Sequence, residues 1–209
     1  TLPPITYPDD LADAEIIGAQ EGAPALRLFP NVVLDGVTLG ADAELAATTS
    51  TRGATVTDGL TLDDATLTVA ASPLSSVDAT LTFQGAQTLG GMGEVLLSGE
   101  NEALGRAVSN RVVFDGVSGA REVLGIDEGV TLRGYGQVTV ETGDAIDLRG
   151  ALVADQDGRT LSLQRVEDLC GDLTIAAGAA IAFDQAVALG VETVLAVGLD
   201  GAGFDAEAG

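Results

Sequence analysis

The chain has 209 residues, of which 46% are apolar and only 3% aromatic, and its formal net charge is −23. All nine basic residues are arginine, so nucleic acid is excluded as a partner, because phosphate binding needs clustered cations. The apolar fraction is too high for a disordered chain, and we expect a folded core built from Val, Leu, Ile and Ala.

The N-terminal segment, residues 1–30, differs from the rest because it holds five of the six prolines. Within it, Leu11, Ala14 and Ile17 follow helical spacing, and Asp9 or Asp10 can cap the first turn. The pattern predicts a short helix from Asp9 to Ile17. We interpret 1–30 as an N-terminal cap or linker and 31–209 as the main domain. The first residue is Thr1 and not Met, which fits removal of a signal peptide and fits an excised fragment of a longer chain equally well.

From residue 31 onward, pairs of apolar residues recur with a single residue between them, which is often Thr. This alternation predicts very short strands, each with one buried face. The pairs are Leu60/Leu62, Leu67/Val69, Leu81/Phe83, Val95/Leu97, Val130/Leu132, Val138/Val140, Ile146/Leu148, Leu161/Leu163, Leu173/Ile175 and Ile181/Phe183. We expect Leu132, Val138, Ile146, Leu148, Leu161 and Leu163 to point inward.

The spacing of these pairs predicts an all-β fold, a parallel β-solenoid with short rungs. Most pairs begin seven or eight residues apart, or about twice that, so three strands make a rung of roughly 20–25 residues. VVLDGV at 32–37 also recurs as VVFDGV at 112–117. The alternative fold is one or more β-sandwich modules, but a sandwich usually has longer strands.

Residues 129–164, GVTLRGYGQVTVETGDAIDLRGALVADQDGRTLSLQ, resemble the repeats of bacterial secreted β-solenoids. These families are the filamentous-haemagglutinin-like exoproteins and the autotransporter passengers. The resemblance implies export, a rigid elongated shaft, and a role in adhesion or in surface layers. It carries no functional residue across to this chain.

Acidic turns are the candidate metal ligands. Asp155 and Asp157 precede Gly158, as in part of a calcium loop, and Asp205 ends a single G-x-G-x-D unit that follows Asp200. We therefore name Asp155, Asp157, Asp200 and Asp205 as calcium candidates; no other cofactor is expected.

Catalytic residues are not expected in this chain. Adjacent carboxylates occur at Asp63–Asp64, but a turn between two strands is the simpler interpretation of that pair. The single cysteine, Cys170, lacks a histidine base and is interpreted as a small buried hydrophobe. Gly90, Gly91 and Gly93 are interpreted as a turn, because no helix pattern follows them.

The sequence thus predicts an exported, non-catalytic structural or adhesive protein, located outside the cell or at its surface. One alternative is a carbohydrate-binding or polysaccharide-cleaving β-helix. A groove lined by Tyr7, Tyr135 and arginines would favour it. The other alternative is a self-assembling extracellular filament or surface-layer subunit. The expected partners are cell-surface glycans or copies of the chain, without membrane insertion.

Overall fold

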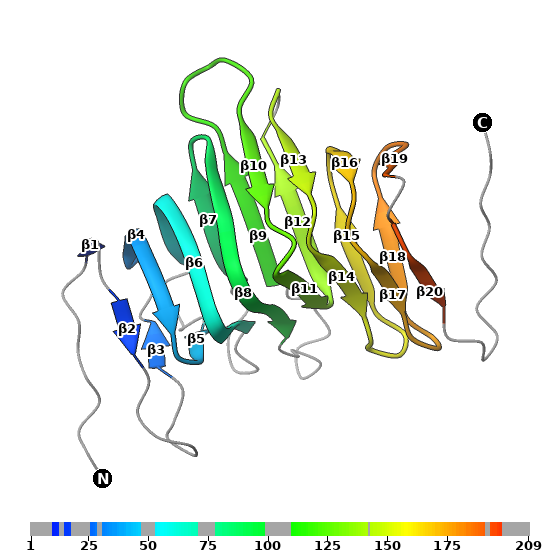
Figure 1. Cartoon of the computed structure of the whole chain (residues 1–209), viewed down its shortest axis with the longest axis horizontal. Helices are drawn as coiled ribbons and strands as arrows, with labels where there is room; N and C mark the ends of the chain where they lie inside the picture. The colour runs from blue at the N-terminus through cyan, green and yellow to red at the C-terminus, as the bar shows by residue number, and fades with distance from the viewer. Residues whose placement is uncertain are drawn as a thin grey trace, which may run out of the picture.

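Twenty strands form one large curled sheet, and no helix occurs among the residues that the structure describes (Figure 1). The structure is a computed structural model that describes residues 10–12, 15–17, 26–28, 31–46, 53–70, 78–98, 110–141, 143–190 and 193–197. The strands are β1 (Asp10–Ala12), β2 (Glu15–Ile17), β3 (Leu26–Leu28), β4 (Val33–Gly40), β5 (Ala43–Ala46), β6 (Gly53–Ala70), β7 (Ala79–Gln84), β8 (Gln87–Ser98), β9 (Asn110–Asp115), β10 (Val123–Ile126), β11 (Val130–Gly134), β12 (Gly136–Val140), β13 (Ala145–Leu148), β14 (Ala151–Ala154), β15 (Thr160–Leu163), β16 (Val166–Leu169), β17 (Leu173–Ile175), β18 (Ala180–Phe183), β19 (Ala188–Leu189) and β20 (Leu195–Val197).

All of the described strand pairs run parallel. The predicted all-β class is therefore confirmed, together with the parallel pairing. The β-sandwich alternative is wrong for the described strands, because a sandwich is built from antiparallel sheets. The finer assignment, a solenoid of short rungs, stays a prediction.

The pairings connect the strands in three series, which we call columns. The first column joins β1, the start of β4, the start of β6, β7, β9, β12, β15 and β18. The second joins β2, the end of β4, the middle of β6, the start of β8, β10, β13, β16 and β19. The third joins β3, β5, the end of β6, the end of β8, β11, β14, β17 and β20.

Paired residues are far apart in sequence, and the step varies along the chain. It is 20 residues from Leu161 to Ile181 and 37 residues from Leu89 to Ile126. The two copies of the VV-x-DGV sequence, at 32–37 and 112–117, both begin in the first column, on β4 and β9. The echo therefore marks equivalent positions in the sheet.

The core is made by the inward side of these strands. The six residues expected to point inward, from Leu132 to Leu163, are all at most 1% exposed, which confirms that prediction. In eight of the ten apolar pairs both residues are buried; the exceptions lie near the C-terminal end of the sheet, where Ile175, Ile181 and Phe183 are partly exposed. Two of the few aromatic residues, Phe83 and Phe114, pair in register and are fully buried.

The predicted helix from Asp9 to Ile17 is wrong where the structure describes it. Strands β1 and β2 occupy 10–12 and 15–17, and both pair with β4. A few apolar residues at helical spacing do not distinguish a helix from a strand in so short a segment, and pairing with the exposed edge of β4 decides it. Strand β3 joins β5 in the same way, so the sheet extends into segment 1–30. Its assignment as a cap or linker stays a prediction.

Glycines allow the backbone to stack closely at the bend between the second and third columns. A Cβ atom at Gly129 would collide with the carbonyl oxygen of Gly91. A Cβ atom at Gly150 would collide with the carbonyl oxygen of Val130, and one at Gly171 with that of Gly150. Only a residue without a side chain fits at these three bends, which explains why glycine recurs there in each successive layer.

Candidate functional site

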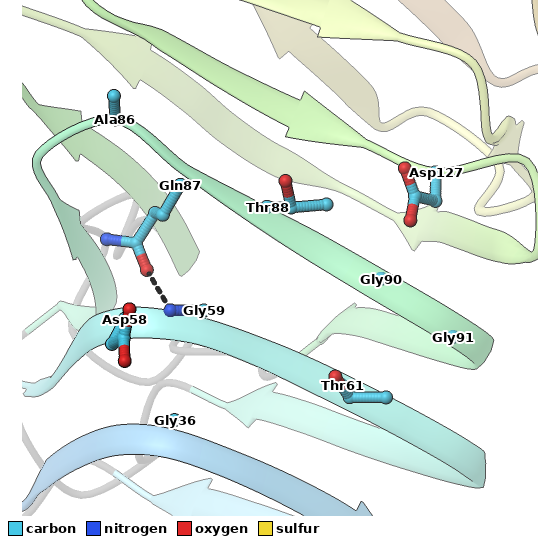
Figure 2. Close-up of a pocket in the computed structure, with 10 residues that line it drawn as sticks. All are labelled: Gly36, Asp58, Gly59, Thr61, Ala86, Gln87, Thr88, Gly90, Gly91 and Asp127. Atoms are coloured by element: carbon cyan, nitrogen blue, oxygen red, sulfur yellow. Dashed lines mark hydrogen bonds between the residues drawn. The ribbon is translucent and has the colours of Figure 1, made fainter.

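An open groove of about 450 Å³ lies on the outer side of the second column (Figure 2). It crosses β4, β6 and β8 and reaches the residue that follows β10. Its lining residues are Gly36, Asp58, Gly59, Thr61, Ala86, Gln87, Thr88, Gly90, Gly91 and Asp127. The groove therefore spans four neighbouring strands of one column, all in parallel register.

The groove forms because glycines, which have no side chains, occupy positions on the outer surface of the sheet here. Thr61 pairs with Gly90 in register, and Gly90 carries nothing that would fill the space beside the threonine. A Cβ atom at Gly90 would lie 2.9 Å from Oδ2 of Asp127, so the carboxylate of Asp127 stands directly over this glycine. The glycines form the floor of the groove, and the polar side chains stand around them.

Gln87 fixes one end of the groove. Its Nε2 donates hydrogen bonds to the carbonyl oxygens of Val56 (3.0 Å) and Gln84 (2.8 Å). Its Oε1 accepts a hydrogen bond from the amide of Gly59 at 3.1 Å (Figure 2). Because both ends of the amide are occupied, Gln87 holds the bend of β6 in place and is not free to bind a ligand through all of its polar atoms.

Four other lining side chains remain available. Asp58, Thr61, Thr88 and Asp127 are exposed, and none of them hydrogen-bonds to another side chain in the part of the chain that the structure describes. The groove therefore presents two hydroxyl groups and two carboxylates, and none of its lining residues is cationic or aromatic. It can accept hydrogen bonds from many directions and can donate through the two hydroxyls.

Asp155, a calcium candidate, lies outside this groove and has another partner. Its Oδ2 accepts a hydrogen bond from Nε of Arg133 at 2.7 Å, and Arg133 also lies 3.5 Å from Oε2 of Glu94. The hydrogen bond that Arg133 donates to Asp155 is the largest influence on the pKa of Arg133 and raises it. Burial lowers this pKa by a smaller amount, and the charges of Asp155 and Glu94 raise it, so that the pKa lies above its ordinary value. A cation at Asp155 would have to displace this guanidinium.

The other calcium candidates do not gather with Asp155. Asp157 is exposed in the turn after β14, beside Gly178, and Asp200 and Asp205 lie outside the described residues. Within the described ranges, no group of three or more His, Cys, Asp or Glu side chains could hold a metal ion. Calcium binding stays a prediction, which melting temperatures in calcium and in chelator at matched ionic strength would test.

The acidic pair, the cysteine and Tyr135, which the sequence analysis also considered, do not line the groove. Asp63 and Asp64 lie within β6, at its bend between the second and third columns, and Asp64 has a φ of 51°. The pair therefore occupies a bend inside one strand and not a turn that separates two strands. Cys170 is exposed just after β16, so its interpretation as a buried hydrophobe is wrong. The ring of Tyr135 lies 5.2 Å from the guanidinium of Arg159, away from the groove lining, and Tyr7 lies outside the described residues.

Sequence reasoning missed the groove, although it noticed part of its floor. Gly90, Gly91 and Gly93 lie within β8, at its bend between the second and third columns, and not in a turn that separates two strands. The available signal was a glycine at an outward position of a strand. Gly59, Gly90 and Asp127 form a groove only because the register of the paired strands brings them side by side, and the sequence does not give that register.

A search of the described part of the chain found no helix long and apolar enough to cross a membrane. No protein-family model matches the chain, and neither the curated proteins nor the solved structures yielded a match.

Proposed function

We propose that the chain is a parallel β-solenoid that serves as an exported, non-catalytic structural or adhesive element. The observation that carries this proposal is the parallel stacking of strands in three columns with steps of 17 to 37 residues. A solenoid is the simplest path for a chain that returns to the same column after each step, with one strand in each of three columns per turn.

Such a coil suits a rigid spacer. Each inner strand hydrogen-bonds to a layer on both sides, and the narrow interior is filled almost entirely by aliphatic side chains. A stack of this kind resists bending, because bending would break backbone pairing along one column. The chain has a net charge of −23, which should keep copies apart and the protein in solution.

Adhesion is the role that the groove favours within this proposal. The proposed partners are glycans at the cell surface. The lining of the groove is polar and has no cationic side chain, which suits the hydroxyl groups of a glycan. Strong binding of nucleic acid is not proposed, because the acidic surface would repel phosphates.

Export and location are tested by fractionating cells that produce the chain naturally. An antibody against the chain should detect it in the surface or medium fraction, with a cytosolic enzyme as the marker for lysis. Detection only together with the cytosolic marker would contradict the proposal.

Small-angle X-ray scattering tests the shape of the protein. It should give the cross-section of an elongated stack, and a spherical envelope would contradict the solenoid.

A self-assembling filament is the second candidate function, favoured by the C-terminal end of the sheet. Leu189, Val194 and Leu195 are 60%, 59% and 42% exposed, whereas Leu28 of β3 at the other end is only 3% exposed. Apolar side chains at an open strand edge favour association with another chain.

A further inference from the structure

We infer that the groove on the second column binds a neutral glycan chain lying along the stacking direction of the strands. This inference rests on the proposed adhesive function and names its site and ligand class. The site is defined by Asp58, Thr61, Thr88 and Asp127 above the glycine floor.

The direction of the groove follows from its lining. Its residues come from β4, β6, β8 with the residue before it, and the residue that follows β10, and these strands are successive neighbours of one column. A ligand in the groove therefore crosses the strands, and meets one strand about every 4.8 Å. This interval is close to the length of one pyranose residue in an extended glycan, so successive sugars can meet equivalent positions on successive strands.

A peptide fits this spacing less well. An extended peptide advances about 3.3 Å per residue, so its side chains and amides fall out of step with strands about 4.8 Å apart. Peptides usually bind a sheet by adding a strand at its edge, where backbone groups are unpaired. The groove lies on the outer face of the sheet, where the backbone groups of β6 and β8 are already paired.

The available groups set the charge of the ligand. The hydroxyls of Thr61 and Thr88 can donate and accept, and the carboxylates of Asp58 and Asp127 accept only, which matches the many hydroxyl donors of a sugar. Glycans that carry carboxylate or sulfate groups should bind poorly, because no cation lines the groove and the whole chain carries −23. Arg149, the cation whose charge acts on Asp127, is paired with Asp147. The expected ligand is thus a neutral hexose or pentose polymer.

The affinity should be modest. No aromatic side chain lines the groove, so the stacking that anchors many sugars is missing. Hydrogen bonds to water are exchanged for hydrogen bonds to protein at little net gain. We expect a dissociation constant of about 1 mM for a single chain, which suits adhesion through many copies of a weak contact.

Nuclear magnetic resonance titration of the full-length chain tests the inference. The probes are the neutral hexamers of xylose, glucose and mannose, a hexamer of galacturonate and hexalysine. At least one neutral hexamer should shift the amides of Thr61, Thr88 and Gly90 at about 10 mM, with no loss of affinity in high salt. The galacturonate hexamer should leave these amides unshifted.

Variants separate groove binding from non-specific contact. The double substitution Thr61→Val and Thr88→Val keeps the side-chain shape and removes both hydroxyls, and it should weaken binding at least about fivefold. Thr174→Val is the matched control, because Thr174 is also an exposed strand threonine but lies in the third column on β17. It should bind as the parent does.

Three results would overturn the inference. They are no shift with any neutral hexamer, equal weakening by Thr174→Val, and shifts of the groove amides by hexalysine alone that disappear in salt. The last would indicate an electrostatic site for basic peptides. None of these results bears on export or on the rod-like shape, whereas a cytosolic chain would contradict the proposed function and leave a measured glycan contact standing.

Discussion

At Gly150 the preceding layer of backbone leaves no room for a side chain. A Cβ atom there would collide with the carbonyl oxygen of Val130 and would lie 2.8 Å from that of Asp127. Backbone carbonyls cannot rotate away as a flexible side chain can, so the two layers would have to separate. Gly125 offers a contrast, because its nearest neighbour would be Oγ1 of Thr88 at 3.5 Å, an ordinary contact.

We therefore expect Gly150→Ala to lower the free energy of unfolding by about 1–3 kcal/mol, as overpacking does in other cores. Gly125→Ala should be neutral or slightly stabilising, because alanine restricts the unfolded chain. Urea unfolding of both variants measures this difference through the midpoint at constant slope. Equal midpoints for the two variants would show that the bend can relax.

Asp144 is a second residue whose surroundings determine how much its substitution lowers the free energy of unfolding. It is 6% exposed, and its two carboxylate oxygens accept hydrogen bonds from the amides of Gly116 (3.1 Å) and Glu122 (2.9 Å). Glu122 in turn accepts hydrogen bonds from the amides of Val117 and Ser118. Two carboxylates thus hold the connection between β9 and β10.

Asp144→Ala should cost about 1–3 kcal/mol, because it leaves two amides without their acceptor. Hydrogen exchange should quicken at Gly116 and Glu122 before it changes elsewhere. Asp168→Ala, at an exposed position of β16, is the control and should change neither quantity. Unaltered exchange at both amides in the Asp144 variant would mean that water replaces the carboxylate without loss.

At the scale of elements, Arg133 connects three consecutive strand layers of the third column. It lies on β11, and its partners Glu94 and Asp155 lie on β8 and just after β14. The Arg133 side chain is 43% exposed, so water and salt screen both contacts. The pKa of Arg133 is raised from a value that is already high. The charged guanidinium therefore makes its full contribution to the free energy of unfolding at neutral pH, and this contribution is lost only in strongly alkaline solution.

Arg133→Gln should therefore lower stability by only about 0.2–1 kcal/mol at low salt, and less at high salt. A double-mutant cycle with Asp155→Asn isolates the pair, because each single change removes the same contact. Arg149→Gln serves as comparison, since Arg149 pairs with Asp147 within one layer. A coupling energy of zero at low salt would show that the cross-layer pair adds nothing.

For the whole molecule, the open edges of the sheet and the charge act against each other. Removing residues 1–30 takes away β1, β2 and β3, and leaves the outer edges of β4 and β5 unpaired. Unpaired edges favour association with another chain. The charge of −23 opposes it, but only over a screening distance of about 10 Å at 0.1 M salt.

The intact chain should be a monomer or a weak oligomer in dilute buffer, and the truncated chain should form longer assemblies as salt is added. Sedimentation velocity of both chains at low and high salt gives the result, with circular dichroism to verify that the truncated chain is folded. A folded truncated chain that stays monomeric at high salt would remove both the N-terminal cap and the filament candidate.

The sequence by itself determined the class of strands and the composition of the core. Alternation places Leu161 and Leu163 on one side of a strand in any register, so the inward residues could be predicted locally. The net charge of −23 and the absence of lysine also follow from the sequence alone, whatever the fold.

Only the tertiary structure decided which layers meet. The step between paired residues ranges from 17 to 37, and no local pattern states it, because it depends on the summed contacts of distant segments. Where a helix was expected from Asp9 to Ile17, that register gives the strands β1 and β2, which both pair with β4. It also placed Thr61 beside Gly90, within reach of Asp127, and so made the groove from residues that lie far apart along the chain.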